Sequence, residues 1–120
     1  TAAPPAPPPA IDTPYGPLTQ AAMAAQAAWM KNAADDIWFI QLHTNTNVDA
    51  FSLEKQVEAA QAALPDAEIR VYDAQLGGNE RTGVVFGRFD TEGEALRALG
   101  ELPPDYRDRG AYVRQARRLR

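Results

Sequence analysis

Residues 37–43 read Ile-Trp-Phe-Ile-Gln-Leu-His. Aromatic and β-branched residues of this kind favour a strand. Gln41 and His43 alternate with Ile40 and Leu42, and successive side chains of a strand point to opposite faces of its sheet. The stretch therefore predicts a half-buried strand with Ile40 and Leu42 in the core and Gln41 and His43 on the opposite face.

Helices and strands alternate downstream of this strand. The predicted elements are a helix capped by Asn47 or Asp49 and ended by Pro65, a strand over 67–73, a turn at Gly77-Gly78-Asn79, a strand over 82–89, a helix from Thr91 to Leu102 and a strand over 111–116. This order is the split βαβ (βαββαβ, ferredoxin-like) arrangement of an α+β domain. It predicts a four-stranded antiparallel sheet with two helices on one face and the other face open to solvent.

The N-terminal part of the chain differs in composition. Residues 1–17 hold seven of the ten prolines, which favours an extended linker over a packed core, although a proline-rich ligand for a partner groove is the alternative. Residues 18–36 contain an expected helix over 18–34, rich in Ala, Gln and Met, with Thr19 as its N-cap. Residues 37–120 form the predicted domain.

The open face of the sheet is where we look for function. Alternation places Val84, Phe86 and Val113 in the core, and it places Phe39, Arg81, Gly83, Val85, Gly87, Tyr112, Arg114 and Ala116 on the open face. The result is a shallow platform of aromatic, amide and guanidinium groups, with glycines that lower its floor. Such a platform suits a flat sugar polymer, for which an exposed Gln41 is the first expected contact and Thr44 the second.

Composition excludes several kinds of chemistry. The chain has no cysteine and a single histidine, so thiolate catalysis and Cys-based zinc sites are ruled out, and His43 has no accompanying motif of a nucleophile triad. The acidic residues lie on expected helix faces, caps and turns rather than as a facing pair. We expect no enzymatic activity, no cofactor and no metal. A net charge of −4 and a pI near 4.9 argue against nucleic acid as the partner.

The chain starts with Thr1 and runs directly into proline-rich sequence. No stretch approaches the roughly 20 apolar residues that span a bilayer, and no signal peptide is evident. We therefore expect a monomeric piece of a longer protein whose membrane anchor lies outside these residues.

Four short motifs, in order, resemble the SPOR (sporulation-related repeat) domain over about residues 37–120. They are Trp38-Phe39-Ile40-Gln41-Leu42, Val84-Val85-Phe86-Gly87-Arg88-Phe89, Glu94-Ala95 and Gly110-Ala111-Tyr112-Val113-Arg114. The resemblance implies a non-catalytic periplasmic module that binds peptidoglycan glycan strands stripped of stem peptides, chiefly at the division septum, through the open sheet face.

The resemblance also implies site residues. Gln41 matches the family's first-strand glutamine, and Thr44 matches a small hydroxyl position just after it. Arg81 departs from the family pattern, since some members carry an aromatic there. Phe39 or Tyr112 could supply the missing stacking surface, and Arg81 could hydrogen-bond acetamido groups.

Two other classes of function remain open on the sequence alone. The RNA-recognition motif shares this element order and also uses its open sheet face, but the outward positions of the third strand carry no aromatic here. A protein-interaction module is the second alternative, with the helix over 18–34 or the sheet face as the docking surface.

Overall fold

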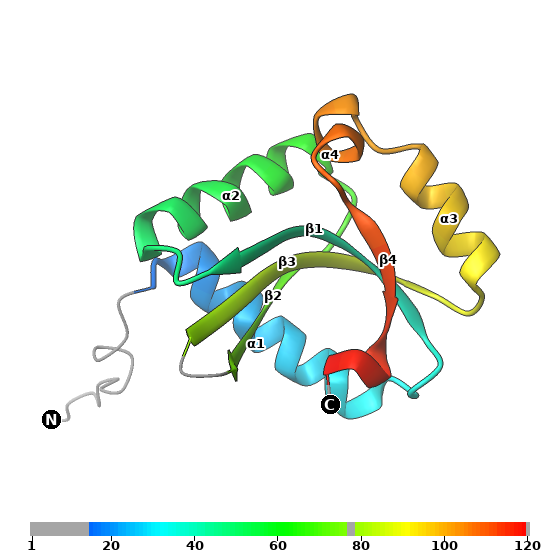
Figure 1. Cartoon of the computed structure of the whole chain (residues 1–120), viewed down its shortest axis with the longest axis horizontal. Helices are drawn as coiled ribbons and strands as arrows, with labels where there is room; N and C mark the ends of the chain where they lie inside the picture. Colours follow the sequence, from blue (N-terminus) through cyan, green and yellow to red (C-terminus); the bar gives the residue numbers. More distant parts are fainter. Residues whose placement is uncertain (1–14, 77–78, 120) are drawn as a thin grey trace, which may run out of the picture.

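A computed structural model of the chain describes residues 15–76 and 79–119 (Figure 1). The elements are α1 (Pro17–Asn32), β1 (Trp38–Thr46), α2 (Ala50–Ala63), β2 (Ile69–Leu76), β3 (Asn79–Phe89), α3 (Glu92–Gly100), α4 (Pro104–Asp108), β4 (Tyr112–Gln115) and a 3-10 helix, η2 (Ala116–Leu119). The first fourteen residues of the predicted linker and Gly77-Gly78 of the predicted turn lie outside the described residues. Among the described residues, no helix is long and apolar enough to cross a membrane.

The four strands form one sheet in the order β2-β3-β1-β4, and every pairing is antiparallel. The α+β split βαβ fold predicted from the sequence is confirmed. The pairing of β1 with β3 is irregular, because Gln41 lies opposite Val85 whereas His43 lies opposite Val84. A bulge of this kind inserts a residue into the ladder and changes which face the following side chains occupy.

The main core lies between the sheet and the two helices α2 and α3, which cover the same face (Figure 1). Ile40 and Leu42 of β1 meet Leu53 and Val57 of α2 there, as the alternation and the helical spacing predicted. Ala95 of α3 is completely buried. Both helices therefore pack an apolar stripe against the sheet, while Phe51 of α2 and Leu96 of α3 remain exposed.

Capping residues set the starts of these helices. Asp49, rather than Asn47, is the N-cap of α2 and accepts a hydrogen bond from the Ser52 backbone N–H at 2.8 Å. Thr91 caps α3 through the Glu94 N–H at 3.2 Å. Two differences from the sequence prediction follow α3. The short helix α4 was not predicted, and the last strand is shorter than 111–116 because Ala116 already belongs to η2.

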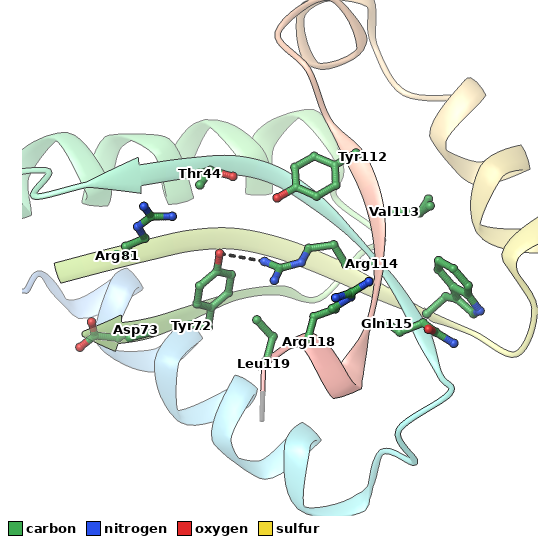
Figure 2. A pocket seen from close by; sticks show the side chains of 12 residues that line it. Thr44, Tyr72, Asp73, Arg81, Tyr112, Val113, Arg114, Gln115, Arg118 and Leu119 are labelled. Carbon is green, nitrogen blue, oxygen red and sulfur yellow. Dashed lines mark hydrogen bonds between the residues drawn. The ribbon is translucent and has the colours of Figure 1, made fainter. Parts of the chain in front are cut away.

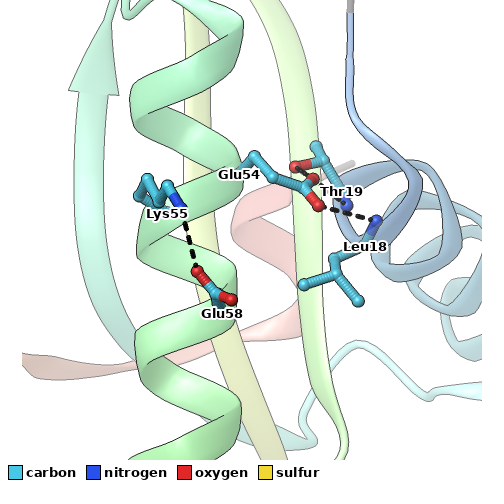
Figure 3. Close-up of polar contacts among 5 residues, drawn as sticks. All are labelled: Leu18, Thr19, Glu54, Lys55 and Glu58. Atoms are coloured by element: carbon cyan, nitrogen blue, oxygen red, sulfur yellow. Dashed lines mark hydrogen bonds and ion pairs between the residues drawn. The ribbon is translucent and has the colours of Figure 1, made fainter.

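The N-terminal helix α1 is docked alongside β2 (Figure 1). Its first turn is held by Glu54 of α2, whose carboxylate accepts hydrogen bonds from the Leu18 N–H at 3.1 Å and from the Thr19 N–H and hydroxyl at 2.9 and 2.8 Å (Figure 3). The predicted N-cap, Thr19, is wrong, because the cap position is Gly16 and the capping carboxylate comes from another helix. Ala22 of α1 joins the main core.

Candidate functional site

A groove of about 660 Å³ lies on the sheet face opposite α2 and α3 (Figure 2). Strands β1 to β4 and the helix η2 all contribute to its walls. The lining residues are Trp38, Thr44, Tyr72, Asp73, Ala74, Arg81, Tyr112, Val113, Arg114, Gln115, Arg118 and Leu119. Three of the five residues predicted as ligand contacts, Thr44, Arg81 and Tyr112, are therefore brought together here.

Gln41 lies beneath this groove and connects its walls. The Gln41 Nε2 donates to the Thr44 hydroxyl at 2.6 Å and to the Tyr72 hydroxyl at 2.8 Å. The Gln41 Oε1 accepts a hydrogen bond from Arg114 at 2.7 Å. Gln41 faces the predicted side of the sheet, but the expectation that it is exposed is wrong, because only 1% of its surface is accessible. It positions three groups that line the groove.

Tyr72 is a site residue that the sequence reasoning missed. It lies directly opposite Gly83 in the pairing of β2 with β3. A Cβ atom at Gly83 would be 2.2 Å from the Tyr72 ring, so glycine is needed for the ring to lie flat on the neighbouring strand. The prediction that Gly83 lowers the floor must be corrected, since the Tyr72 ring fills the space above it. The signal for Tyr72 is the register between β2 and β3, which the sequence alone does not determine.

Phe39 is on the predicted face but is completely buried. Trp29 of α1 packs edge-on against the Phe39 ring, with 5.9 Å between centroids. Trp29 also stacks on the guanidinium of Arg70, 4.2 Å from the ring centroid. Val85, likewise predicted to be outward, is fully buried. The open face is thus only partly open, and the expectation that Phe39 offers a stacking surface is wrong.

Arg70 ties this covered part of the sheet to α1. Its Nε donates to Gln26 of α1 at 2.8 Å, and its Nη2 donates to the Gly87 carbonyl at 2.9 Å. Burial lowers the pKa of Arg70 to about 10, while the nearby carboxylate of Glu68 acts in the opposite direction. The guanidinium therefore remains charged at neutral pH and is satisfied by polar partners, as a buried charge requires.

His43 lies on the other side of the sheet from the groove, contrary to the alternation. The bulge after Gln41 turns it toward the cavity between α2 and α4, where its ring meets Tyr106 edge-on at 5.7 Å. Burial and the positive charge of Arg109 both lower the pKa of His43. Ala116, also predicted to be outward, is completely buried in η2. Val113 packs against the core as predicted.

The groove is positively charged although the chain is acidic. Three guanidinium groups line it, from Arg81, Arg114 and Arg118, and Asp73 is the one carboxylate among the described residues of the lining. Burial and the neighbouring Glu80 raise the pKa of Asp73. Tyr112 adds an aromatic ring with 41% of its surface exposed. Such a lining of aromatic, hydroxyl and guanidinium groups defines a binding surface for a polar ligand with apolar patches.

A small α+β binding module with its site on the sheet face is the class that fold and groove define. The SPOR domain family model matches residues 47–115, more than half of the chain, and the chain belongs to this family. SPOR domains bind peptidoglycan and are generally non-catalytic. No curated protein and no solved structure gives a significant match to the chain.

Proposed function

We propose that the groove binds peptidoglycan glycan strands, with a preference for strands denuded of stem peptides, and thereby brings a cell-division protein to the septum. The observation that carries the proposal is the convergence of Thr44, Arg81 and Tyr112 on one groove of the sheet face. The proposal also includes a periplasmic location and a membrane-anchored parent protein. These two parts of the proposal are supported by the family, whose members occur in envelope proteins.

The chemistry of the lining suits a sugar chain. A pyranose ring presents apolar C–H groups that pack on an aromatic ring, and the exposed Tyr112 offers such a ring. Hydroxyl and acetamido groups need partners that donate and accept, and the Thr44 hydroxyl does both. Gln41 acts from below, because its amide is already bonded to Thr44, Tyr72 and Arg114. It is a positioning residue for the site.

Co-sedimentation with purified sacculi tests the proposal. The whole chain is mixed with sacculi before and after an amidase removes the stem peptides, and the pelleted fraction is measured. We expect stronger pelleting after stripping. No pelleting with either preparation would overturn the proposal and leave a protein partner as the leading alternative.

A matched pair of aromatic variants assigns any binding to the groove. Tyr112→Ala removes the exposed ring of the groove, whereas Phe51→Ala removes a ring on α2 that is 71% exposed and lies outside it. We expect Tyr112→Ala to weaken pelleting about tenfold, as the loss of a contact aromatic does, while Phe51→Ala binds like the wild type. Equal losses for both would place the contact elsewhere.

A further inference from the structure

We propose that the groove recognises the free lactyl carboxylates of denuded glycan through Arg114, Arg118 and Arg81, so that charge as well as the absence of bulk selects the stripped strand. The inference rests on the proposed function, because it names the chemical group that the same groove would read. One of the three arginines, Arg118, lies beyond the matched family region of residues 47–115.

The first observation is the local charge. The chain carries 12 Lys and Arg against 16 Asp and Glu, whereas the groove lining within residues 15–76 and 79–119 includes three arginines and one carboxylate, Asp73. The groove therefore has the opposite sign to the molecule as a whole. A cleft lined by one sign of charge concentrates ligands of the other sign, which here means an anion.

The second observation is that the guanidinium groups are available. The Nη1 atom of Arg114 donates a hydrogen bond to Gln41 at 2.7 Å and another to the Tyr72 hydroxyl at 3.2 Å, which Figure 2 draws. Its Nη2 and Nε edge, which can bind a carboxylate with two parallel hydrogen bonds, has no partner among the described residues. Arg81 and Arg118 are exposed and form no ion pair within residues 15–76 and 79–119.

Removal of the stem peptide changes the charge of the glycan strand. In intact peptidoglycan the lactyl group of each N-acetylmuramic acid is joined to the stem peptide by an amide, which is neutral at that position. Amidase hydrolysis breaks the C–N bond, adds water across it and leaves a carboxylate on the sugar and an amine on the peptide. Each stripped muramic acid thus gains one negative charge close to the sugar ring. Arginine is well suited to carboxylates because of its planar, always charged fork.

The fixed orientation of Arg114 strengthens this recognition. Gln41 and Tyr72 hold its guanidinium before any ligand arrives, so little side-chain freedom is lost on binding. Arg118 comes from η2 and Arg81 from β3, on different walls of the groove. Carboxylates that recur along one strand can therefore meet more than one arginine.

The experiment separates charge from bulk. Denuded glycan strands are prepared with an amidase, and half of the sample is treated with methylamine and a carbodiimide, which converts each lactyl carboxylate into a small neutral amide. Binding of the whole chain to both samples is measured at low and high salt. We expect the neutral strands to bind about tenfold more weakly and the difference to shrink at high salt, because salt screens exposed charge pairs.

Variants assign the effect to the groove. Arg118→Gln should lower affinity for charged strands about fivefold and leave affinity for neutralised strands unchanged. Arg117→Gln is the matched control, because Arg117 is the exposed neighbour in η2 that does not line the groove. Arg117→Gln should bind both samples like the wild type.

The outcomes distinguish this inference from the proposed function. Equal binding of charged and neutralised strands would overturn the carboxylate reading while leaving glycan binding intact. Absence of binding to either sample would overturn both. Equally strong, salt-sensitive binding of a single-stranded oligonucleotide would also overturn it, since the groove would then be a general polyanion site.

Discussion

Removing the side-chain amide of Gln41 should lower stability as well as glycan binding. Gln41→Ala deletes its hydrogen bonds with three groove-lining partners, Thr44, Tyr72 and Arg114, together with the longer bond of its Nε2, at 3.3 Å, to the His43 carbonyl. A neutral hydrogen bond contributes about 1 kcal/mol net and one to a charged group about 2 kcal/mol, which gives an upper value of about 4 kcal/mol. All three partners line the groove and can bond to water in the variant. We therefore expect the free energy of unfolding to fall by about 2 kcal/mol.

Gln41→Glu separates stability from binding. Glutamate has the same shape, keeps an acceptor for Arg114 and gains charge, and the hydroxyls of Thr44 and Tyr72 can rotate to donate to it. The free energy of unfolding should stay within about 1.5 kcal/mol of the wild type at pH 7. Binding to denuded glycan should nevertheless fall about tenfold, because a carboxylate below the groove occupies Arg114 and repels an anionic ligand.

Urea unfolding and glycan pelleting of the same samples check both expectations. Gln61→Ala is the control, because Gln61 is exposed on α2 and its replacement should change stability by less than about 0.5 kcal/mol. Leu42→Ala is the reference for a core cavity, with an expected loss of about 2 to 5 kcal/mol. Unchanged stability of Gln41→Ala, or wild-type binding by Gln41→Glu, would show that Gln41 does not position the groove as reasoned.

Three further predictions concern α1 and the groove floor. Glu54→Gln should destabilise the protein by about 0.5 to 1 kcal/mol at neutral pH. Burial raises the pKa of Glu54, but the hydrogen bonds from Thr19 and Leu18 outweigh it, so the folded-state pKa is lowered from 4.5. The wild type is therefore more stable than Glu54→Gln above pH 4.5, and this difference in the free energy of unfolding should disappear as the pH falls through the folded-state pKa. Urea unfolding across this pH range tests the expectation, and a difference that persists at lower pH would contradict it. Trp29→Ala should cost about 2 to 4 kcal/mol in the same assay through lost packing on Arg70, and a loss below 1 kcal/mol would mean that α1 is only loosely docked. Gly83→Ala should destabilise by about 1 to 3 kcal/mol and weaken glycan pelleting, because the added methyl displaces the aromatic ring above it; normal pelleting would show that the ring can move without consequence.

The sequence carried enough information for the strand order and the core. Ile40 and Leu42 are buried, Asp49 and Thr91 are caps, and Val113 packs inward, all of which follow from local alternation and capping chemistry. These features depend on neighbours in the chain, so that periodicity and residue type are sufficient to predict them.

The prediction failed where distant parts of the chain meet. The exposure of Gln41 and Phe39 depends on Tyr72, Arg114 and Trp29, which no local pattern connects to them. Alternation also assumes a regular ladder, and the bulge after Gln41 breaks that assumption. Side-chain direction before a bulge is therefore predictable from period two, whereas direction after it is not.

The docking of α1 alongside β2 also protects the edge of the sheet. An edge strand leaves backbone groups unpaired, and these can template pairing with another molecule. Here α1 lies alongside β2, which is one of the two edge strands. The other edge strand, β4, has only four residues. A chain shortened to begin at residue 37 would uncover β2 along its length. Such a chain should be more prone to self-association through strand addition, a hazard for any binding assay that uses it.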